Sequence, residues 1–281
     1  MDWYIGKEWN DTARGLQKKV LSLEFQRVEK PLLISTVEFT VKKPCLNLGT
    51  RPSKYLASNE TQHTLEMGTA DSPIDCYIEI LLQQFVLGET SACSIITKTG
   101  ERLQFELKLD RIVSNIQIDK LSAGEIYNLS LKYKEKGVTM YKAHPRFACD
   151  YFSRAAKLLI TYKPFDKLDE EKNGIDNHAL ELLFVQIQTN LAACMLLEKR
   201  YEHVIYHTQF VETQEQPSEK SIYRRALAYY YLKEFEKAQK LIERVPQYEE
   251  KREFSKLRDN IATSWKSSNA NYKQLVQRMF S

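Results

Sequence analysis

The chain has 281 residues, of which 43% are hydrophobic and 28% are charged, and its formal net charge is +4. This length predicts two domains, at roughly 100–200 residues per domain. The small positive surplus argues against the basic face that nucleic-acid binding requires, and the nine glycines form neither a P-loop nor a dinucleotide-binding motif. Five cysteines without CxxC spacing favour reduced thiols over a disulfide framework.

The N-terminus gives no sign of a targeting segment. Residues 1–10 carry Asp2, Lys7 and Glu8 and lack an apolar core, so we expect no signal peptide. No stretch approaches the roughly 18 uninterrupted apolar residues of a membrane helix. We therefore expect a cytoplasmic protein that does not bind membranes, with the nucleus left open as a second location.

The first part of the chain shows the period-two alternation of half-buried strands. Residues 32–41 read LLISTVEFTV, and residues 103–109 read LQFELKL with an apolar side chain at every second position. Residues 94–97 predict another short strand, and Thr99-Gly100 predicts the turn that follows it.

One helix is expected between these strands. Ser72 suits a helix cap, Pro73 suits the first turn, and Gly88 suits the end of the helix. The sequence therefore predicts an α+β domain over residues 1–121, in which an antiparallel sheet surrounds a single helix.

From about residue 122 the pattern is helical throughout. Ser122 and Glu125 have the spacing of a capping box at a helix start. Helical segments then recur in pairs, and a last helix over about 249–280 would close the open end of the stack, as repeat arrays require. We expect an all-α domain over residues 122–281.

The helix pairs recur with the 34-residue period of tetratricopeptide (TPR) repeats. The clearest unit covers residues 221–245, where Ala226 and Ala238 let its two helices approach closely. A second unit includes residues 190–207, and the first carries Gly137, Ala148, Phe152 and Ala155. A generic helical bundle is the alternative, but three units in one register favour a TPR superhelix.

Four hydrogen-bond donors lie on the first helices of these repeats: Lys134, Asn190, Lys220 and Arg224. Lys220 and Arg224 are four residues apart and share a helix face. Because the first helices of a TPR stack line its groove, we expect the donors to converge there, with no acid among them. Such a site suits the carboxylates of a peptide C-terminus. The alternative is that all four are ordinary solvated charges and amides.

These segments resemble the repeats of the large FKBP-type immunophilins. The resemblance lies in KEKGVTMYK at 134–142, NLAAC at 190–194 and EKSIYRRA at 219–226. In that family the residues matching the four donors form a carboxylate clamp for the C-terminal Met-Glu-Glu-Val-Asp peptide of heat-shock protein 90. The resemblance therefore implies this chaperone as a partner. Val138 stands where clamps often carry a second asparagine, which lowers the expected affinity.

Residues 64–88 resemble the strand and central helix of an FKBP fold, and residues 103–118 resemble its last strand and linker. The isomerase pattern is missing, because Leu56-Ala57 replaces a Phe-Asp pair and Ile78 replaces the tryptophan floor of the pocket. The flap is missing as well, since Thr97 leads through a tight turn into the next strand. A noncanonical member of the family is the closest resemblance, which implies a non-catalytic co-chaperone with a casein-kinase-type kinase as its client.

Two other functions remain open. A divergent but active prolyl isomerase would need an aromatic pocket, which residues 50–110 do not provide. A nucleic-acid binder could use Tyr229–Tyr231 as a stacking platform, although packing roles are commoner at such positions.

The remaining signals are weaker. His203 and His207 have metal-ligand spacing, but no third ligand is evident, so we expect no metal, no cofactor and no catalytic residue. Trp3 and Trp9 precede any strand pattern, and we expect them to dock the N-terminal arm on the β domain.

Overall fold

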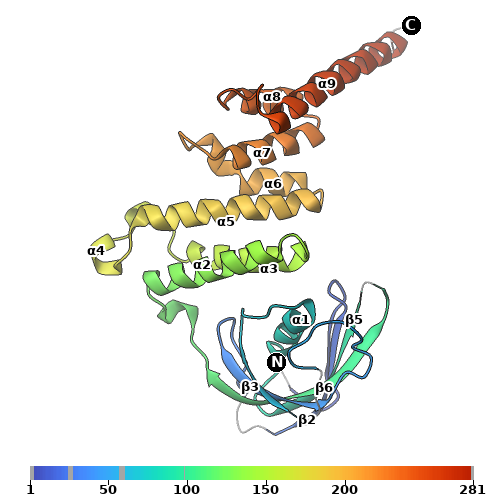
Figure 1. The fold of residues 1–281 in the computed structure, drawn as a ribbon, viewed down its shortest axis with the longest axis vertical. Helices are drawn as coiled ribbons and strands as arrows, with labels where there is room; N and C mark the ends of the chain where they lie inside the picture. Colours follow the sequence, from blue (N-terminus) through green and yellow to red (C-terminus); the bar gives the residue numbers. More distant parts are fainter. Residues whose placement is uncertain (1–2, 25–27, 57–60, 98, 280–281) are drawn as a thin grey trace. The chain divides into compact units, whose positions relative to one another are not determined.

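The computed structural model describes residues 3–24, 28–56, 61–97 and 99–279, with no account of the side chains of residues 271–278. The chain divides into two compact units, residues 1–125 and 126–281. Strands around one ten-residue helix form most of the described part of the first unit, and the second is helical (Figure 1). The predicted order, an antiparallel sheet domain before a helical domain, is therefore confirmed.

In the part of the chain that the structure describes, the first unit is a six-stranded sheet whose neighbouring strands are all antiparallel. The strand order is β1-β2-β5-β6-β3-β4. The strands are β1 Glu8–Asp11, β2 Leu16–Leu23, β3 Thr36–Lys43, β4 Gln62–Glu66, β5 Glu89–Ile96 and β6 Arg102–Ser114. Helix α1, Pro73–Leu82, lies in the hollow of the curved sheet (Figure 1). Its apolar side chains and the inner face of the sheet share one core.

The segments predicted as strands fall within or overlap β3, β5 and β6, and Ser72 caps α1 as expected. The Ser72 hydroxyl accepts a hydrogen bond from the Asp75 amide at 3.1 Å. The expected helix end near Gly88 is wrong, because the chain leaves the helix after Leu82 through tight turns. Gly88 has a φ of +77°, and a Cβ there would lie 2.0 Å from the Glu24 carbonyl oxygen. This glycine therefore permits a close crossing of two chain segments rather than a helix cap.

Strand β2 contains a charged residue on its buried face. Leu16, Lys18 and Val20 all point inward, with exposed fractions of 0%, 5% and 1%. The Lys18 ammonium forms an ion pair with the carboxylate of Glu89, which is fully buried. Burial lowers the pKa of Lys18, while the attraction of Glu89 opposes that shift. Ser91 Oγ completes the cluster by donating to the same carboxylate at 2.6 Å.

The N-terminal arm docks on this cluster, as expected for the two tryptophans. Trp3 Nε1 donates a hydrogen bond to Glu89 Oε2 at 2.8 Å. The Lys7 and Lys30 ammonium groups lie 4.5 and 5.0 Å from the centroid of the Trp3 ring. Trp9, in β1, packs against the core. The arm is therefore part of the first unit's structure.

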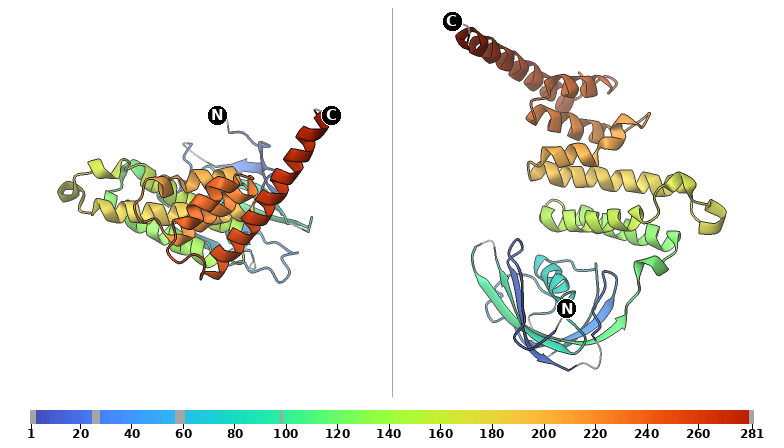
Figure 2. Two further views of the ribbon diagram at one scale, coloured as in Figure 1. Left: turned by 90° about the horizontal axis from the view of Figure 1, so that it is seen from above. Right: turned by 180° about the vertical axis from the view of Figure 1, so that it is seen from behind.

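The second unit is a stack of helices (Figure 2). They are α2 Ala123–Met140, α3 Pro145–Ile160, α4 Glu170–Asn173, α5 Asn177–Leu197, α6 Tyr201–His207, α7 Glu219–Tyr231, α8 Phe235–Glu243 and α9 Arg252–Met279. Short 3-10 turns lie at η1 Ile118–Lys120, η2 Phe165–Lys167 and η3 Gln209–Glu212. The pairs α2/α3, α5/α6 and α7/α8 follow one another, and α9 covers the end of the stack.

The start of the stack has the predicted local structure. Ser122 N donates to Glu125 Oε2 at 2.8 Å, and Glu125 N donates to Ser122 Oγ at 3.3 Å, which is a capping box. A Cβ at Gly137 would lie 2.5 Å from Phe152 Cε1. Glycine at this position therefore lets the α3 aromatic ring reach the backbone of α2.

The end of the stack is an apolar cluster shared by α7, α8 and α9. Ala226 and Ala238 are fully buried where α7 and α8 meet. Phe254, Leu257 and Ile261 bring the first half of α9 into the same cluster. The predicted capping helix matches α9, although Phe280 lies outside the described residues.

Helix α5 is apolar enough to resemble a membrane span. Among the described residues it is the one helix that passes a length and composition test for such a span, and 56% of the apolar window is buried inside the protein. Counting only uninterrupted apolar residues overlooks it, because polar residues such as Gln188 and Asn190 break the run. Its neighbours α3, α6 and α7 account for much of the burial.

Candidate peptide-binding groove

Two adjacent cavities lie on the second unit, where α7 faces α5 and the end of α2. The larger has a volume of about 570 Å³ and is lined by Tyr141, Ala193, Leu196, Leu197, Glu219, Lys220, Tyr223, Arg224, Glu253 and Phe254. The smaller has a volume of about 240 Å³ and is lined by Val138, Thr139, Tyr141, Lys142, Phe152, Asn190, Ala193 and Arg224. Because Tyr141, Ala193 and Arg224 line both, we treat the two cavities as one groove with a larger and a smaller chamber.

Arg224 lies at the junction of the two chambers. One of its guanidinium nitrogens donates to the Thr189 carbonyl oxygen on α5 at 2.6 Å, which fixes the side chain between the helices. Burial lowers the pKa of this guanidinium, and nearby Tyr141 and Cys194 oppose the shift. Arginine remains protonated even so, which leaves a partly desolvated cation facing the groove.

Asn190 and Lys220 flank Arg224. Asn190 lines the smaller chamber and Lys220 lines the larger one. Three of the four predicted donors are therefore brought together around Arg224. Lys134 is not among the described residues that line either chamber, and its ammonium donates to Gln186 Oε1 at 2.8 Å. Gln186 precedes Asn190 by one turn of α5, so Lys134 lies further along the same helix face.

The expectation of a groove without acids is wrong. Glu219 and Glu253 line the larger chamber beside Lys220. Glu219 forms an ion pair with Lys251 at 2.6 Å. These acids come from the start of α7 and from the capping helix α9.

Two further lining residues, Tyr141 and Lys142, were not predicted. The Tyr141 hydroxyl donates to the Ala193 carbonyl oxygen at 3.4 Å, and burial raises the pKa of its phenol. Lys142 adds an exposed cation to the smaller chamber. Both follow directly after α2, so a search restricted to the repeat helices misses them. Val138 lines the same chamber and is 55% exposed, so its apolar side chain faces the groove.

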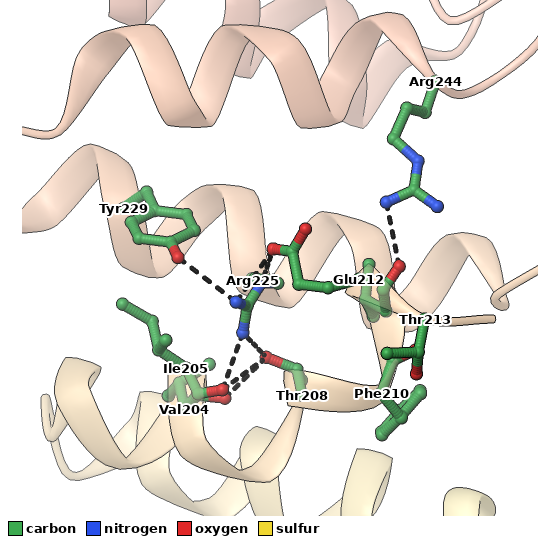
Figure 3. A network of polar contacts seen from close by, with 10 residues as sticks. Val204, Ile205, Thr208, Phe210, Glu212, Thr213, Arg225, Tyr229 and Arg244 are labelled. Atoms are coloured by element: carbon green, nitrogen blue, oxygen red, sulfur yellow. Dashed lines mark hydrogen bonds and ion pairs between the residues drawn. The ribbon is translucent and has the colours of Figure 1, made fainter.

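The neighbouring Arg225 has a structural role (Figure 3). It is 5% exposed, and it donates to the Ile205 carbonyl oxygen at 2.7 Å, to Glu212 Oε1 at 2.9 Å and to the Tyr229 hydroxyl at 3.2 Å. This network holds α6 and η3 against α7. The two adjacent arginines of α7 therefore have different roles: Arg224 lines the groove, and Arg225 stabilises the packing of the helices.

Comparison with known proteins decides the family. The chain is 68% identical to the protein Bride of doubletime of Drosophila melanogaster over 286 residues, and the alignment covers 100% of each chain. The chain belongs to the Bride of doubletime family. Residues 9–114 match the domain described as BDBT FKBP like N-terminal, and residues 122–206 match the Bride of doubletime-like TPR domain. The predicted resemblance to FKBP-type immunophilins with TPR repeats is therefore confirmed.

A solved structure supports the same assignment. The crystal structure of residues 1–211 of CG17282 is 63% identical to this chain. It covers 73% of this chain and 100% of its own, with a TM-score of 0.64.

In this Bride of doubletime family member, the positions that match an isomerase pocket belong to the core of the FKBP-like unit. Leu56 and Ile78 are both fully buried, and Ala57 lies outside the described residues. Phe39 and Tyr55 form an edge-to-face aromatic pair with centroids 5.3 Å apart, and His63 lies 5.2 Å from Tyr55. Burial raises the pKa of the Tyr55 phenol to about 12. The rings of Phe39, Tyr55 and His63 are therefore packed against one another.

The two histidines with metal-ligand spacing have other hydrogen-bond partners. His207 Nδ1 lies 2.7 Å from Gln188 Oε1, and His203 Nε2 lies 2.7 Å from a guanidinium nitrogen of Arg200. Burial lowers the pKa of His207 to about 4. Within the described part of the chain, no group of three potential ligands surrounds a metal position.

Proposed function

We propose that this chain is a non-catalytic co-chaperone scaffold whose TPR unit binds the C-terminal peptide of heat-shock protein 90. The peptide carboxylates would be held by a clamp of Lys134, Asn190, Lys220 and Arg224. The observation that carries the proposal is the position of Arg224 at the junction of two chambers, with Asn190 in one and Lys220 in the other. The proposed location is the cytoplasm, with the nucleus as a second site of action.

The chemistry of the groove suits a carboxylate. Asn190 offers an amide donor, Lys220 a mobile ammonium and Arg224 a planar guanidinium that is already positioned by Thr189. A hydrogen bond to a charged group contributes about 1.5–3 kcal/mol. The contact is partly exposed, so its strength should fall as salt concentration rises.

The FKBP-like unit is proposed to bind a protein client, with a casein-kinase-type kinase as the candidate, and to lack isomerase activity. Burial of Leu56 and Ile78 supports the absence of catalysis, since neither side chain is available to line an open pocket. The enzyme alternative, a divergent active prolyl isomerase, makes the opposite forecast. An X-Pro peptide assay separates the two, because catalysis well above background would contradict the scaffold proposal.

The clamp is tested by titrating the intact protein with a Met-Glu-Glu-Val-Asp peptide in a calorimeter. Lys220→Ala should weaken binding at least about tenfold, which corresponds to roughly 1.4 kcal/mol, without lowering thermal stability. Lys157→Ala on α3 removes the same charge at an exposed position outside the groove and should leave affinity unchanged. Amidation of the peptide C-terminus should mimic Lys220→Ala. Equal binding by wild type and Lys220→Ala, or no binding at millimolar peptide, would refute the clamp.

A further inference from the structure

The two chambers of the groove differ in charge. The smaller chamber is lined by two cations, Lys142 and Arg224, and no acid is among its lining residues in the described structure. The larger chamber is lined by two cations, Lys220 and Arg224, and by two acids, Glu219 and Glu253. A terminal carboxylate is therefore favoured in the smaller chamber, and the acids of the larger chamber weaken the attraction that its two cations exert on further negative charge.

The two acids of the larger chamber are not equivalent. Glu219 is 2.6 Å from the Lys251 ammonium, so its charge is compensated within the protein. No ion pair within the described residues involves Glu253, which stands on an exposed part of α9. Glu253 also lies close to Tyr223 in the groove wall. Burial is the largest cause of the raised pKa of the Tyr223 phenol, and the negative charge of Glu253 is the second largest. Its carboxylate is thus the acid that a bound peptide would meet.

The rest of the larger chamber is apolar. Tyr223 and Phe254 form an edge-to-face pair with centroids 5.3 Å apart, and Leu196 and Leu197 complete the wall. Aromatic and aliphatic walls of this kind favour a large apolar side chain. A cation at the end of such a side chain, or on the next residue, would find Glu253 as its partner.

We propose that Glu253 is a specificity-determining residue of the groove, which lowers the affinity for C-terminal peptides with several acids before the terminal carboxylate and raises the affinity for peptides with apolar and basic side chains there. The inference rests on the proposed binding of a peptide C-terminus. It deepens that function, because it predicts that the acidic chaperone tail binds below the affinity that the donors alone would allow.

The test compares two peptides with free C-termini, Met-Glu-Glu-Val-Asp and Met-Lys-Lys-Val-Asp, by calorimetry on the full chain. The ratio of the two affinities, lysine peptide over glutamate peptide, should be about tenfold lower in Glu253→Gln than in wild type. Glu253 attracts a lysine and repels a glutamate at the same position, and each of these exposed contacts contributes about threefold at separations of several ångströms in water. Asp259→Asn removes one acid from the same helix outside the groove and should keep the wild-type ratio.

The outcomes separate the two proposals. An unchanged ratio of the two affinities in Glu253→Gln overturns the role of Glu253 while leaving the clamp intact. Equal binding of free and amidated peptides overturns the clamp, even if the charge preference persists. No binding of either peptide at millimolar concentration overturns both.

Discussion

The FKBP-like unit and the TPR unit differ at the positions where a ligand would bind: these positions are filled in the first and open in the second. In the FKBP-like unit, Leu56 and Ile78 stand at pocket positions and are fully buried. In the TPR unit, Asn190, Lys220 and Arg224 line two chambers. Polar donors at an open groove stay hydrated and available to a ligand, whereas a filled apolar site adds to the core. The comparison therefore supports the proposal that the second unit, rather than the first, recognises a peptide.

The two units are alike in another respect, because each buries a charge that ties distant segments together. In the FKBP-like unit the Lys18–Glu89 pair joins β2 and β5 and receives Trp3. In the TPR unit Arg225 joins α6 and η3 to α7. Each network can therefore be broken separately, which makes the independence of the units measurable.

The largest test removes the first unit altogether. A fragment of residues 122–281 keeps the Ser122 cap of α2 and should lose the sheet signal in circular dichroism while melting as a cooperative helical protein. Peptide affinity should match that of the full chain. A molten or insoluble fragment, alongside a stable full chain, would show that the units depend on each other.

Glu89→Gln should cause the next largest effect. It leaves the buried Lys18 ammonium without its counter-charge, and breaking a buried pair in this way costs about 3–5 kcal/mol. Urea melts followed through the sheet signal should show the loss, with peptide binding by the TPR unit unchanged. Glu24→Gln removes an exposed partner of Lys108 and should change stability by less than about 0.5 kcal/mol. Equal losses of unfolding free energy in the two variants would mean that the buried Lys18–Glu89 pair contributes no more to stability than an exposed pair.

Arg225→Met should destabilise the TPR unit alone. The substitution removes the shorter of two side-chain hydrogen bonds to the Ile205 carbonyl and the Arg225 hydrogen bonds to Glu212 and the Tyr229 hydroxyl, at a cost of about 2–4 kcal/mol. Arg244→Met is the matched control, since Arg244 is exposed and, among the described residues, its side chain donates one hydrogen bond, to the Val211 carbonyl oxygen at 2.8 Å. Helical melting measured for both variants decides the point. If Arg244→Met were as destabilising as Arg225→Met, the buried Arg225 network would have no special role in stabilising the TPR unit.

His207 should give the smallest effect, as a pH dependence. Its folded pKa of about 4 lies below the ordinary 6.5, so the unfolded chain takes up a proton first as the pH falls. Stability from this residue is full above pH 6.5, declines between 6.5 and 4, and is absent below 4. Solvent screening of the half-buried ring limits it to about 1 kcal/mol. Melts of wild type and His207→Gln from pH 7.5 to 4 should converge as the pH falls; parallel curves would contradict this.

The sequence predicts the parts of the fold in which local chemistry and packing agree. Ser72 and Ser122 sit at real helix starts, and Gly137 meets Phe152 where repeat helices need a close approach. Strand β2 escapes prediction because Lys18 occupies a buried position and breaks the apolar alternation. The distant Glu89 and the Phe85 ring make that lysine acceptable inside, and no local pattern contains this information.

The residues that line the groove are likewise predicted only in part. Asn190, Lys220 and Arg224 follow from their positions on repeat helices, whereas Lys142 lies after α2 and Glu253 belongs to the capping helix. Residues outside the repeat pattern reach the groove only through the stacking of helices. Their contribution therefore requires the three-dimensional structure.

The fluorescence of Trp3 can report whether the N-terminal arm is docked. Of the protein's three tryptophans, Trp3 and Trp9 belong to the FKBP-like unit, and Trp265 lies on α9 at 37% exposure. Replacing Trp265 with Phe would confine indole fluorescence to the first unit. Because the Trp3 indole donates to the buried Glu89 and lies among lysine ammonium groups, release of the arm should shift its emission to longer wavelength. Docking and release of the arm could then be followed without any added label.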